Sequence, residues 1–511
     1  MDLADLQFES NFVRDLPADP VPGNVPRQVR NASYTRVAPT PVAAPRLLGW
    51  SEALGEYLRI SRPSPEAIEV LAGNKVLPGM QPYAARYGGH QFGVWAGQLG
   101  DGRAITLGEV IARDGSRQEL QLKGAGRTPY ARTADGRAVL RSSLREFLCS
   151  EAMHFLGVPT TRALSLVATG EPVTRDMFYD GHPQDEPGAV VCRVAPSFVR
   201  FGNFQIHVAL GEEEPLKRLH GYIVRNYYPE HEPDWFHELC QRTARLVVDW
   251  MRLGFVHGVM NTDNMSILGI TIDYGPYGWL EGYDPSWTPN TTDAETRRYC
   301  YGNQPEIALW NLARLAEALL PLQEKEHLEG GLALYAQTYE DAMRAALAQK
   351  LGLAAFTEET DNALVADFFK LLAATETDWT IFCRNLAKVE EAHDDVQLVA
   401  PLEPAFYTEV SAEHRASLAA WLRRYLERAR HEAPGRGERM NQANPKYVPR
   451  NYLAQQAIDA IEQRGDTSVL ERLMKTLERP YDEQPGNEDL AARRPEWARH
   501  RPGCSALSCS S

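Results

Sequence analysis

The chain has 511 residues, of which 43% are hydrophobic and 24% are charged, and its formal net charge at pH 7 is −14. This composition is that of a soluble globular protein, and the negative charge argues against a general binder of nucleic acid or of anionic membranes. No apolar run approaches the roughly 18–20 residues of a membrane span, and the acidic N-terminus "MDLADLQFESNFVRDLP" lacks signal-peptide or transit character, so we expect a cytoplasmic protein.

Residues 1–87 are expected to form an arm and short helices that pack on the core. Residues 15–47 are rich in proline and poor in periodic apolar residues, which is typical of an extended segment. Residues 47–80 contain helical pieces; in "SPEAIEVLAG" Ser64 is the expected N-cap and Gly73 follows the helix end.

Residues 88–205 predict a small β-rich lobe. The segments 103–111 and 117–126 are expected to be strands joined by the turn "RDGS". A helix follows in "SSLREFLCSEAMHFLG", and we expect it to begin at Ser143, which has capping-box spacing with Glu146.

Residues 206–435 predict a larger helical lobe, and residues 436–511 predict a helical extension with a cysteine-bearing tail. The main helical patterns of this half cover 234–254, 304–320, 366–388, 411–431, 453–463 and 468–477. The predicted fold class is therefore α+β and bilobal, with a small β-rich N-lobe, a larger helical C-lobe, an N-terminal arm and a C-terminal helical extension.

The seven cysteines are dispersed and do not predict a disulfide framework or a zinc site. Four of them lie in apolar contexts and are expected to be reduced core residues: Cys149, Cys192, Cys240 and Cys383. Cys504 and Cys509, in the closing "CSALSCSS", are expected on an exposed tail.

The stretch "HGVMNTDNMSILGITIDYGPYG" (257–278) predicts a short buried hairpin with carboxylates and an amide at its mouth. Asp263 and Asn264 lie on one side of the apolar run and Asp273 on the other. Such oxygen ligands can converge on a hard cation, and Mg²⁺ is usually held by one or two protein oxygens together with phosphates. An ordinary turn stabilised by Asx hydrogen bonds is an equally good interpretation of this stretch alone.

Lys123 and Glu146 are the next candidates. In "ELQLK" Leu120 and Leu122 share one strand face, and Gln121 and Lys123 share the other. A lysine on a polar strand face is more often solvated than functional, and Glu146 is already explained by the capping box. Each residue alone is therefore weak evidence.

Three further groups could hold an anion. Gly100, Gly102 and Arg103 lie in a glycine-rich loop whose N–H groups could approach a phosphate, although Gly-Asp-Gly is also an ordinary hairpin turn. Asp135-Gly136 is a second such turn. Arg193 and Arg200 interrupt an apolar segment, and guanidinium groups match phosphate oxygens.

The order of these groups is that of a protein-kinase-like ATP site. His257 and Asn264 occupy the first and eighth places of a kinase catalytic loop, and Asp273-Tyr-Gly stands where Asp-Phe-Gly would. The third place, which holds the kinase base, is Val259, and valine cannot accept a proton. Either the chain is a dead kinase, or Asp263 serves a different transfer.

Over most of its length the sequence resembles the selenoprotein O family, which consists of kinase-like protein adenylyltransferases. The passages that carry the resemblance are "RYGGHQFGVWAGQLGDGRA", "LQLKGAGRTPYAR", "DGRAVLRSSLREFLCSEAM", "RVAPSFVRFGNF", "HGVMNTDNMSILGITIDYGPYG" and "NPKYVPRNY". The resemblance implies a protein-kinase-like fold and transfer of AMP from ATP to Ser, Thr or Tyr hydroxyls of proteins. It also implies a nucleotide bound flipped relative to kinases, so that pyrophosphate leaves.

The resemblance carries roles over residue by residue. Asp263 would accept the proton, and Asn264 and Asp273 would bind Mg²⁺ or Mn²⁺. The residues implied to form the ATP site are Gly100, Gly102, Arg103, Lys123, Asp135, Gly136, Glu146, Arg193, Arg200 and Asp273. We expect a monomer with ATP and proteins as its partners.

The tail also resembles the family, as a bacterial-type member with cysteine in place of selenocysteine. Eukaryotic members carry selenocysteine third from the end, where this chain has Cys509. A Cys504–Cys509 bridge, a Cys509–Cys300 bridge or no bridge all remain open. Two other functions also remain open: an ordinary phosphotransferase, and a catalytically silent ATP-binding scaffold with a redox-sensing tail.

Overall fold

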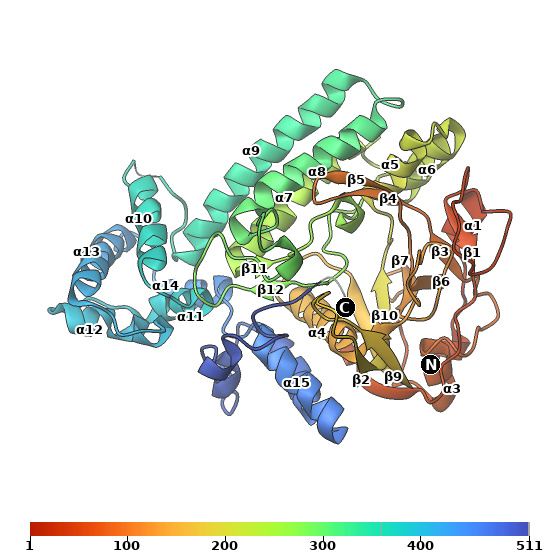
Figure 1. Cartoon of the computed structure of the whole chain (residues 1–511). Coiled ribbons are helices and arrows are strands. Elements are labelled where there is room, and N and C mark those ends of the chain that lie inside the picture. Colours follow the sequence, from red (N-terminus) through yellow and green to blue (C-terminus); the bar gives the residue numbers. More distant parts are fainter. Residues whose placement is uncertain (233, 358, 509–511) are drawn as a thin grey trace.

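The computed structural model describes residues 1–232, 234–357 and 359–508, and it divides into a sheet-rich lobe and a larger helical lobe (Figure 1). The strands of the main sheet lie at the right of Figure 1, and the helices of residues 304–443 lie to the left of them. The predicted α+β class with a small β-rich lobe and a larger helical lobe is confirmed.

The sheet-rich lobe is built on one antiparallel sheet. Among the described residues it has eight strands in the order β1-β3-β6-β7-β10-β9-β2, with β8 paired to β10. These strands are β1 (Tyr34–Arg36), β2 (Arg46–Trp50), β3 (Tyr83–Ala85), β6 (Ala104–Ile111), β7 (Arg117–Lys123), β8 (Ala138–Val139), β9 (Arg162–Arg175) and β10 (Gln184–Ala195). The strands predicted at 103–111 and 117–126 are thus confirmed as β6 and β7.

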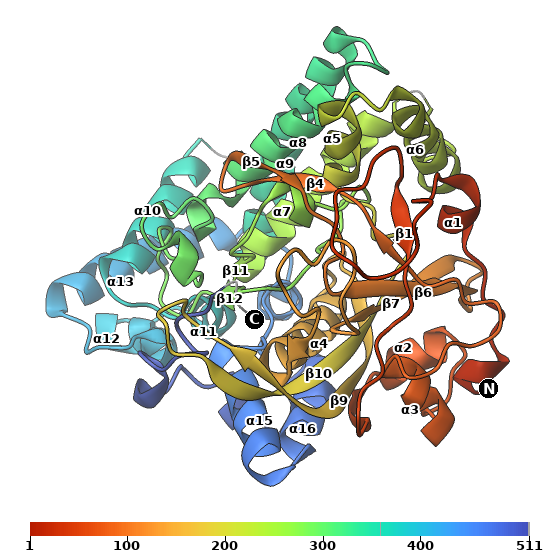
Figure 2. The ribbon, with the colours of Figure 1, turned by 45° about the vertical axis from the view of Figure 1, so that its right-hand side comes forward.

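Both faces of the sheet are covered. One face packs on α2 (Glu52–Tyr57), α3 (Pro65–Leu71) and the N-terminal arm. The other packs on α4 (Leu140–Phe155), which is backed in turn by α15 (Asn451–Arg464) and α16 (Ser468–Leu477) (Figure 2). Because both faces are covered, the polar face of β7 is not solvated.

The first 87 residues do more than pack on the core. They supply strands β1, β2 and β3 to the main sheet, and the rest of the arm runs mostly without regular structure after α1 (Asn11–Asp15). The domain boundary proposed at residue 87 therefore cuts a continuous sheet. Ser64 caps α3 as predicted, because its side chain accepts a hydrogen bond from the N–H of Ala67.

Two small ribbons lie between the lobes. They are β4 (Gly88–Gln91) with β5 (Val94–Gln98), and β11 (Phe255–Val256) with β12 (Gly278–Trp279). Both views place the β4–β5 hairpin beside α5 and α8 (Figures 1 and 2).

The helical lobe contains the predicted helices and also several helices that no predicted range covers. Its helices are α5 (Phe201–Ala209), α6 (Glu213–Tyr227), α7 (Trp235–Leu253), α8 (Gln304–Leu319), α9 (Lys325–Lys350), α10 (Asp361–Ala374), α11 (Trp379–Asn385), α12 (Asp395–Val399), α13 (Ala412–Ala429) and α14 (Arg436–Ala443). Short 3₁₀ turns are η1 (Leu3–Asp5), η2 (Thr262–Asn264), η3 (Thr291–Asp293), η4 (Tyr301–Asn303), η5 (Leu386–Lys388), η6 (Ala400–Ala405), η7 (Glu488–Ala491) and η8 (Glu496–Ala498). The long helix α9 was not predicted, and the pattern at 366–388 is split between α10 and α11.

The capping box predicted for Ser143 and Glu146 is wrong. Helix α4 begins at Leu140, and its N-cap Val139 belongs to β8, which delivers the chain directly into the helix. Ser143 therefore lies inside the first turn, and its hydroxyl caps nothing. Glu146 is consequently free to pair with residues outside its own helix.

The hairpin predicted around residues 265–272 is also wrong. The backbone of this segment bonds to other segments instead of to itself: Ser266 bridges to Arg200, and Thr271 bridges to Thr160. The burial expected for its apolar residues is met at Met265, Ile267, Leu268 and Ile272, whereas Ile270 is only partly buried.

The six described cysteines are all unbridged and buried. This confirms the four predicted core thiols but overturns the exposed position expected for Cys504, which packs with the core of α4, α15 and α16. Cys509 lies outside the described residues. In the described part of the chain, no helix combines the length and the apolar character that crossing a membrane requires.

Candidate active site

A cleft of about 600 Å³ lies between the two lobes, and residues of both lobes line it. It collects most of the predicted site residues: Gly100, Gly102, Arg103, Lys123, Gly136, Arg193, Arg200, Asp263, Asn264 and Asp273. Two predicted residues, Glu146 and Asp135, are not part of its lining.

Lys123, Glu146 and Arg193 form a buried network at the base of the cleft. Lys123 Nζ lies 2.6 Å from Glu146 Oε2, and Arg193 Nη1 lies 3.1 Å from Glu146 Oε1. Strand β7 supplies Lys123, helix α4 supplies Glu146 and strand β10 supplies Arg193. With 14% of its side chain exposed and a buried carboxylate as its partner, Lys123 is not a solvated surface lysine.

Asp273 is held between two arginines. Its carboxylate forms ion pairs with Arg193 and with Arg200, and its backbone is in the left-handed region with φ +58°. Burial by itself raises the pKa of Asp273, but Arg200, Arg193 and Lys123 overcome that effect and hold this pKa well below its usual value. Asp273 is therefore a carboxylate that stays ionised in a buried setting.

Arg200 links both lobes. Its Nη1 donates to the carbonyl of Asp263 at 2.8 Å, and its guanidinium lies 4.7 Å from the ring centroid of Tyr87. A second acid, Asp101, lies 3.7 Å from Arg200 Nη2. The expectation that Arg193 and Arg200 share one site is thus met by the geometry.

Asp135 lies outside the cleft. Its carboxylate is exposed and pairs with Arg175 at 2.7 Å, and Arg175 itself lines the cleft. Any effect of Asp135 on a ligand must therefore pass through Arg175, while its neighbour Gly136 lines the cleft directly.

Asp263 and Asn264 lie in the η2 turn. Asn264 Nδ2 donates to the carbonyl of Val259 at 2.9 Å, so its amide oxygen is not used in that bond. Asp263 Oδ2 accepts from Gln91 Nε2 at 3.1 Å, whereas Oδ1 is buried and makes no hydrogen bond. Burial raises the pKa of Asp263 to about 6, although Gln91 acts in the opposite direction.

His257 fixes the distance between this turn and Asp273. Its Nε2 donates to the carbonyl of Ile272 at 2.9 Å, and its backbone N–H donates to Gln304 Oε1 at 2.9 Å. These two bonds give His257 a structural role. Burial lowers the pKa of its imidazole and keeps the ring neutral.

The donor set fits a hard divalent cation. Asn264 offers an amide oxygen and Asp273 an ionised carboxylate, and both line the same cleft. Oxygen ligands of this kind are what Mg²⁺ and Mn²⁺ prefer, with substrate phosphates completing the coordination.

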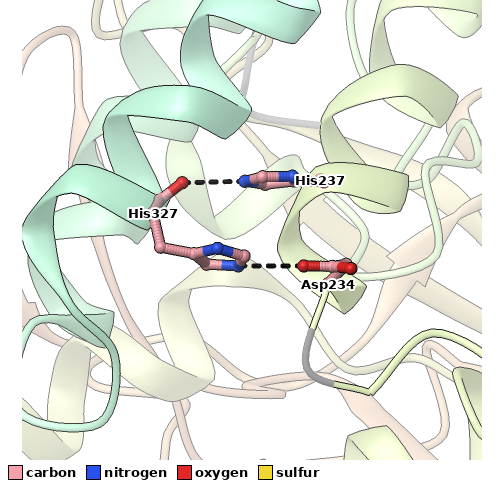
Figure 3. A group of neighbouring side chains, drawn as sticks. All are labelled: Asp234, His237 and His327. Carbon is pink, nitrogen blue, oxygen red and sulfur yellow. Dashed lines mark hydrogen bonds and ion pairs between the residues drawn. The ribbon is translucent and has the colours of Figure 1, made fainter.

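Within the described residues, a separate group of three potential metal ligands is formed by Asp234, His237 and His327 (Figure 3). His237 Nε2 already donates to the carbonyl of His327 at 2.8 Å. The two rings stack with centroids 4.1 Å apart and planes 14° apart, so their in-plane lone pairs do not converge on one point. This group ties the start of α9 to the start of α7, and we assign no metal to it.

Asp101 and Gln91 of the cleft lining were not predicted, and neither was Gln121, which bonds to Arg193 of the lining. Gln121 accepts from Arg193, Asp101 accepts from the N–H of Ala85 at 3.0 Å, and Gln91 contacts Asp263. Gln121 could have been found, because it shares a strand face with Lys123. Gln91 carries no such signal, since its role depends on a turn that is distant in sequence.

Comparison with known proteins identifies the family. The model of the family described as "Protein adenylyltransferase SelO" matches residues 26–478. The chain belongs to the SelO family. A relative from Nitrosospira multiformis named "Protein nucleotidyltransferase YdiU" is 61% identical, with 100% of this chain and 97% of the relative covered. SelO-family relatives of the same name from Rhodopirellula baltica and Aromatoleum aromaticum are each 56% identical, with at least 99% of both chains covered. The chain is therefore an enzyme of the nucleotidyltransferase class.

Among solved structures, the chain is similar to ROP2 from Toxoplasma gondii, described as a virulence factor with a protein-kinase fold and no enzymatic activity. The two are 14% identical with a TM-score of 0.21, over 57% of this chain and 83% of that one. A TM-score this low carries no argument. The kinase-like character of this SelO-family chain rests on its two lobes and on the Lys123–Glu146 pair at their junction.

Proposed function

We propose that the chain transfers AMP from ATP to Ser, Thr or Tyr hydroxyl groups of proteins and releases pyrophosphate. The observation that carries the proposal is the shared cleft, in which Asp263, Asn264 and Asp273 face the cations of the sheet-rich lobe. Family membership supplies the reaction class, and the cleft supplies groups suited to it.

The cations of the cleft suit a triphosphate. Lys123, Arg103, Arg193 and Arg200 line one cavity in a chain whose net charge is −14. Fixed cations in a partly dry cleft stabilise the charge that develops on a departing pyrophosphate, and they need no reorganisation during the reaction.

The proposed step is an in-line displacement at the α-phosphorus. The acceptor oxygen forms a bond to that phosphorus while the bond to the oxygen bridging toward the β-phosphorus breaks, and pyrophosphate leaves with the bonding electrons. The hydroxyl proton passes to the carboxylate of Asp263, which lines the cleft. A positioned base contributes about 10²–10⁴-fold in rate.

Asn264 and Asp273 are the residues that would hold Mg²⁺ or Mn²⁺. When bound, the cation neutralises phosphate charge and orients the triphosphate. The chain's own contribution is to keep Asp273 ionised through Arg193 and Arg200 and to fix Asn264 through its bond to Val259.

Label transfer tests the proposal. Purified protein is incubated with a protein acceptor, Mg²⁺ or Mn²⁺, and ATP labelled at either the α- or the γ-phosphate. We expect protein to be labelled from the α-phosphate only, and Asp263→Asn to slow the labelling about 10²–10⁴-fold, the contribution of a positioned base. Labelling from the γ-phosphate would make the chain a phosphotransferase, and ATP binding without any label transfer would make it a silent scaffold. The cytoplasmic location and the monomeric state remain predictions, which cell fractionation and light scattering can check.

A further inference from the structure

The β4–β5 hairpin is fastened to the turn that carries Asp263. The N–H of His90 donates to Thr262 Oγ1 at 2.7 Å. The N–H of Phe92 donates to Asn261 Oδ1 at 3.2 Å and to the Tyr299 hydroxyl at 2.9 Å. Three consecutive residues of the hairpin, 90–92, therefore bond to the turn, and Gln91 is the middle one.

The Gln91 side chain bonds to one of the two carboxylate oxygens of Asp263 and not to the other. Its Nε2 donates to Oδ2 at 3.1 Å, while Oδ1 is buried without a hydrogen bond. A carboxylate can only accept, so the amide must present its NH₂ group to Asp263. Oδ2 is thereby hydrogen-bonded to the hairpin, while Oδ1 is enclosed beside it.

The carboxylate of Asp263 keeps this orientation only if neighbouring groups restrain it. The last torsion of an aspartate side chain is broad and roughly two-fold, so an unrestrained carboxylate rotates between many orientations. Gly89 limits the other side, because a Cβ at that position would overlap Asp263 Oδ1. The hairpin thus packs against Oδ1 through Gly89 and bonds to Oδ2 through Gln91, and together these contacts fix the rotation about the Cβ–Cγ bond.

The position of Gln91 is itself fixed by the hairpin. Gln91 is the last residue of β4 and pairs with Val94 across a two-residue turn. The turn residues Phe92 and Gly93 have φ +50° and +84°, as in the tight turns that match strand twist. The amide is therefore presented from a rigid element and not from a mobile loop.

We propose that Gln91 is a positioning residue for the transfer reaction. Its hydrogen bond to Oδ2 fixes the orientation in which the carboxylate of Asp263 meets the acceptor hydroxyl. The proposal rests on the proposed role of Asp263 as proton acceptor. It assigns Gln91 to the chemical step and not to the binding of ATP, because its amide contacts Asp263 and none of the cationic side chains of the cleft.

The test separates kcat from KM. In Gln91→Leu the donor is lost, and we expect kcat for α-label transfer to fall about 10- to 100-fold, the size expected for a lost hydrogen bond to a charged group. The KM for ATP should stay within about 2-fold, because uniform binding is untouched. Gln91→Glu, which keeps the shape but replaces the donor with an acceptor, should lose kcat in the same way.

Gln98 is the matched control on the same hairpin. Its Oε1 accepts from the N–H of Val29 at 2.8 Å and its Nε2 donates to the carbonyl of Arg27 at 2.9 Å, so it anchors the hairpin to the arm and not to Asp263. Gln98→Leu should retain kcat within about 3-fold, since a merely structural contact contributes little to the chemical step. A kcat loss in Gln98→Leu as large as in Gln91→Leu would overturn the proposal.

A double mutant separates this inference from the function on which it depends. If Gln91 acts through Asp263, Gln91→Leu should cause no further loss in an Asp263→Asn background. Full activity in Asp263→Asn would refute the proposed base. An Asp263→Asn variant slowed as expected, together with wild-type kcat in both Gln91 variants, would refute the positioning role alone. Thermal melts of each variant check folding, and Gln91→Glu serves if Gln91→Leu does not fold.

Discussion

Asp273 is the residue on which the charge balance of the cleft depends. Its carboxylate pairs with both Arg193 and Arg200, and Glu146 pairs with Lys123. These five side chains carry three positive and two negative charges, so one positive charge is left over to attract a phosphate. In the proposed complex Asp273 would help to hold the cation, and phosphate oxygens would pair with the arginines.

We therefore expect Asp273→Asn to abolish metal-dependent α-label transfer, with a loss of about 100-fold or more, because a neutral amide is a weak ligand for a hard cation. Transfer is measured over a series of Mg²⁺ and Mn²⁺ concentrations. Unchanged transfer would contradict the metal site.

Asp135→Asn is the control for that variant. Its carboxylate is exposed and contacts Arg175 at the rim of the cleft. The KM for ATP should rise by no more than about 5-fold, because an exposed ion pair contributes about 0.2–1 kcal/mol.

At the scale of elements, the closest contact near the site joins α5 to β4. Gly202, in the first turn of α5, packs on the backbone of Gly88, and a Cβ at Gly202 would overlap the carbonyl oxygen of Gly88. This contact keeps the β4–β5 hairpin in the position from which it bonds to residues 261–263.

Gly202→Ala should accordingly lower the free energy of unfolding by about 1–3 kcal/mol, as overpacking does, and should also reduce kcat by displacing the hairpin. Denaturant unfolding and label transfer measure the two effects.

Gly221→Ala is the opposite case in α6, where a Cβ would meet nothing within 4 Å. Because alanine is the better helix former, this change should stabilise the protein by about 0.5–1 kcal/mol and leave kcat unchanged. A destabilised Gly221→Ala would show that helix propensity does not govern this position.

The sequence predicted elements well where one local pattern dominated. The strands β6 and β7 follow from alternation around a tight turn, and helix α16 matches its predicted bounds of 468–477. Helix α9 was missed because Gly330-Gly331 interrupts its pattern. Those glycines make room for α7, since a Cβ at Gly331 would lie 2.7 Å from Cδ1 of Phe236.

The errors near the site have a common physical cause. The start of α4 and the path of residues 265–272 are set by pairing with distant strands, which no local pattern reports. Cys504 is buried because α15 holds it: Asn451 Nδ2 donates to its carbonyl at 2.8 Å. The residue types of the site were predictable from motif order, whereas the partners of Asp263 and Glu146 required the fold.

At the scale of the whole molecule, the C-terminal extension is tied to the helical lobe by one buried ion pair. Both terminal guanidinium nitrogens of Arg450 donate to the carboxylate of Asp378, at 2.8 and 2.9 Å. Arg450 lies just before α15, and Asp378 is the N-cap of α11. Their side chains are 2% and 0% exposed.

Arg450→Met should lower the free energy of unfolding by about 3–5 kcal/mol, because it leaves a buried carboxylate without its cation. Chemical denaturation measures the change. In the exposed pair of Arg423 with Asp395, Arg423→Met should cost no more than about 1 kcal/mol. Equal costs for the two variants would contradict a special role for the buried pair.

The burial of α4 has a last consequence. Apart from Ser142, His154 and Phe155, every residue of this helix is buried, between the sheet on one side and α15 and α16 on the other. Protein kinases are switched off by swinging the corresponding helix outward, which separates its glutamate from the lysine. In this protein the same movement would also have to separate α4 from α15 and α16 and expose their shared apolar core to water. The exposure of this apolar surface makes an outward swing of α4 costly in free energy.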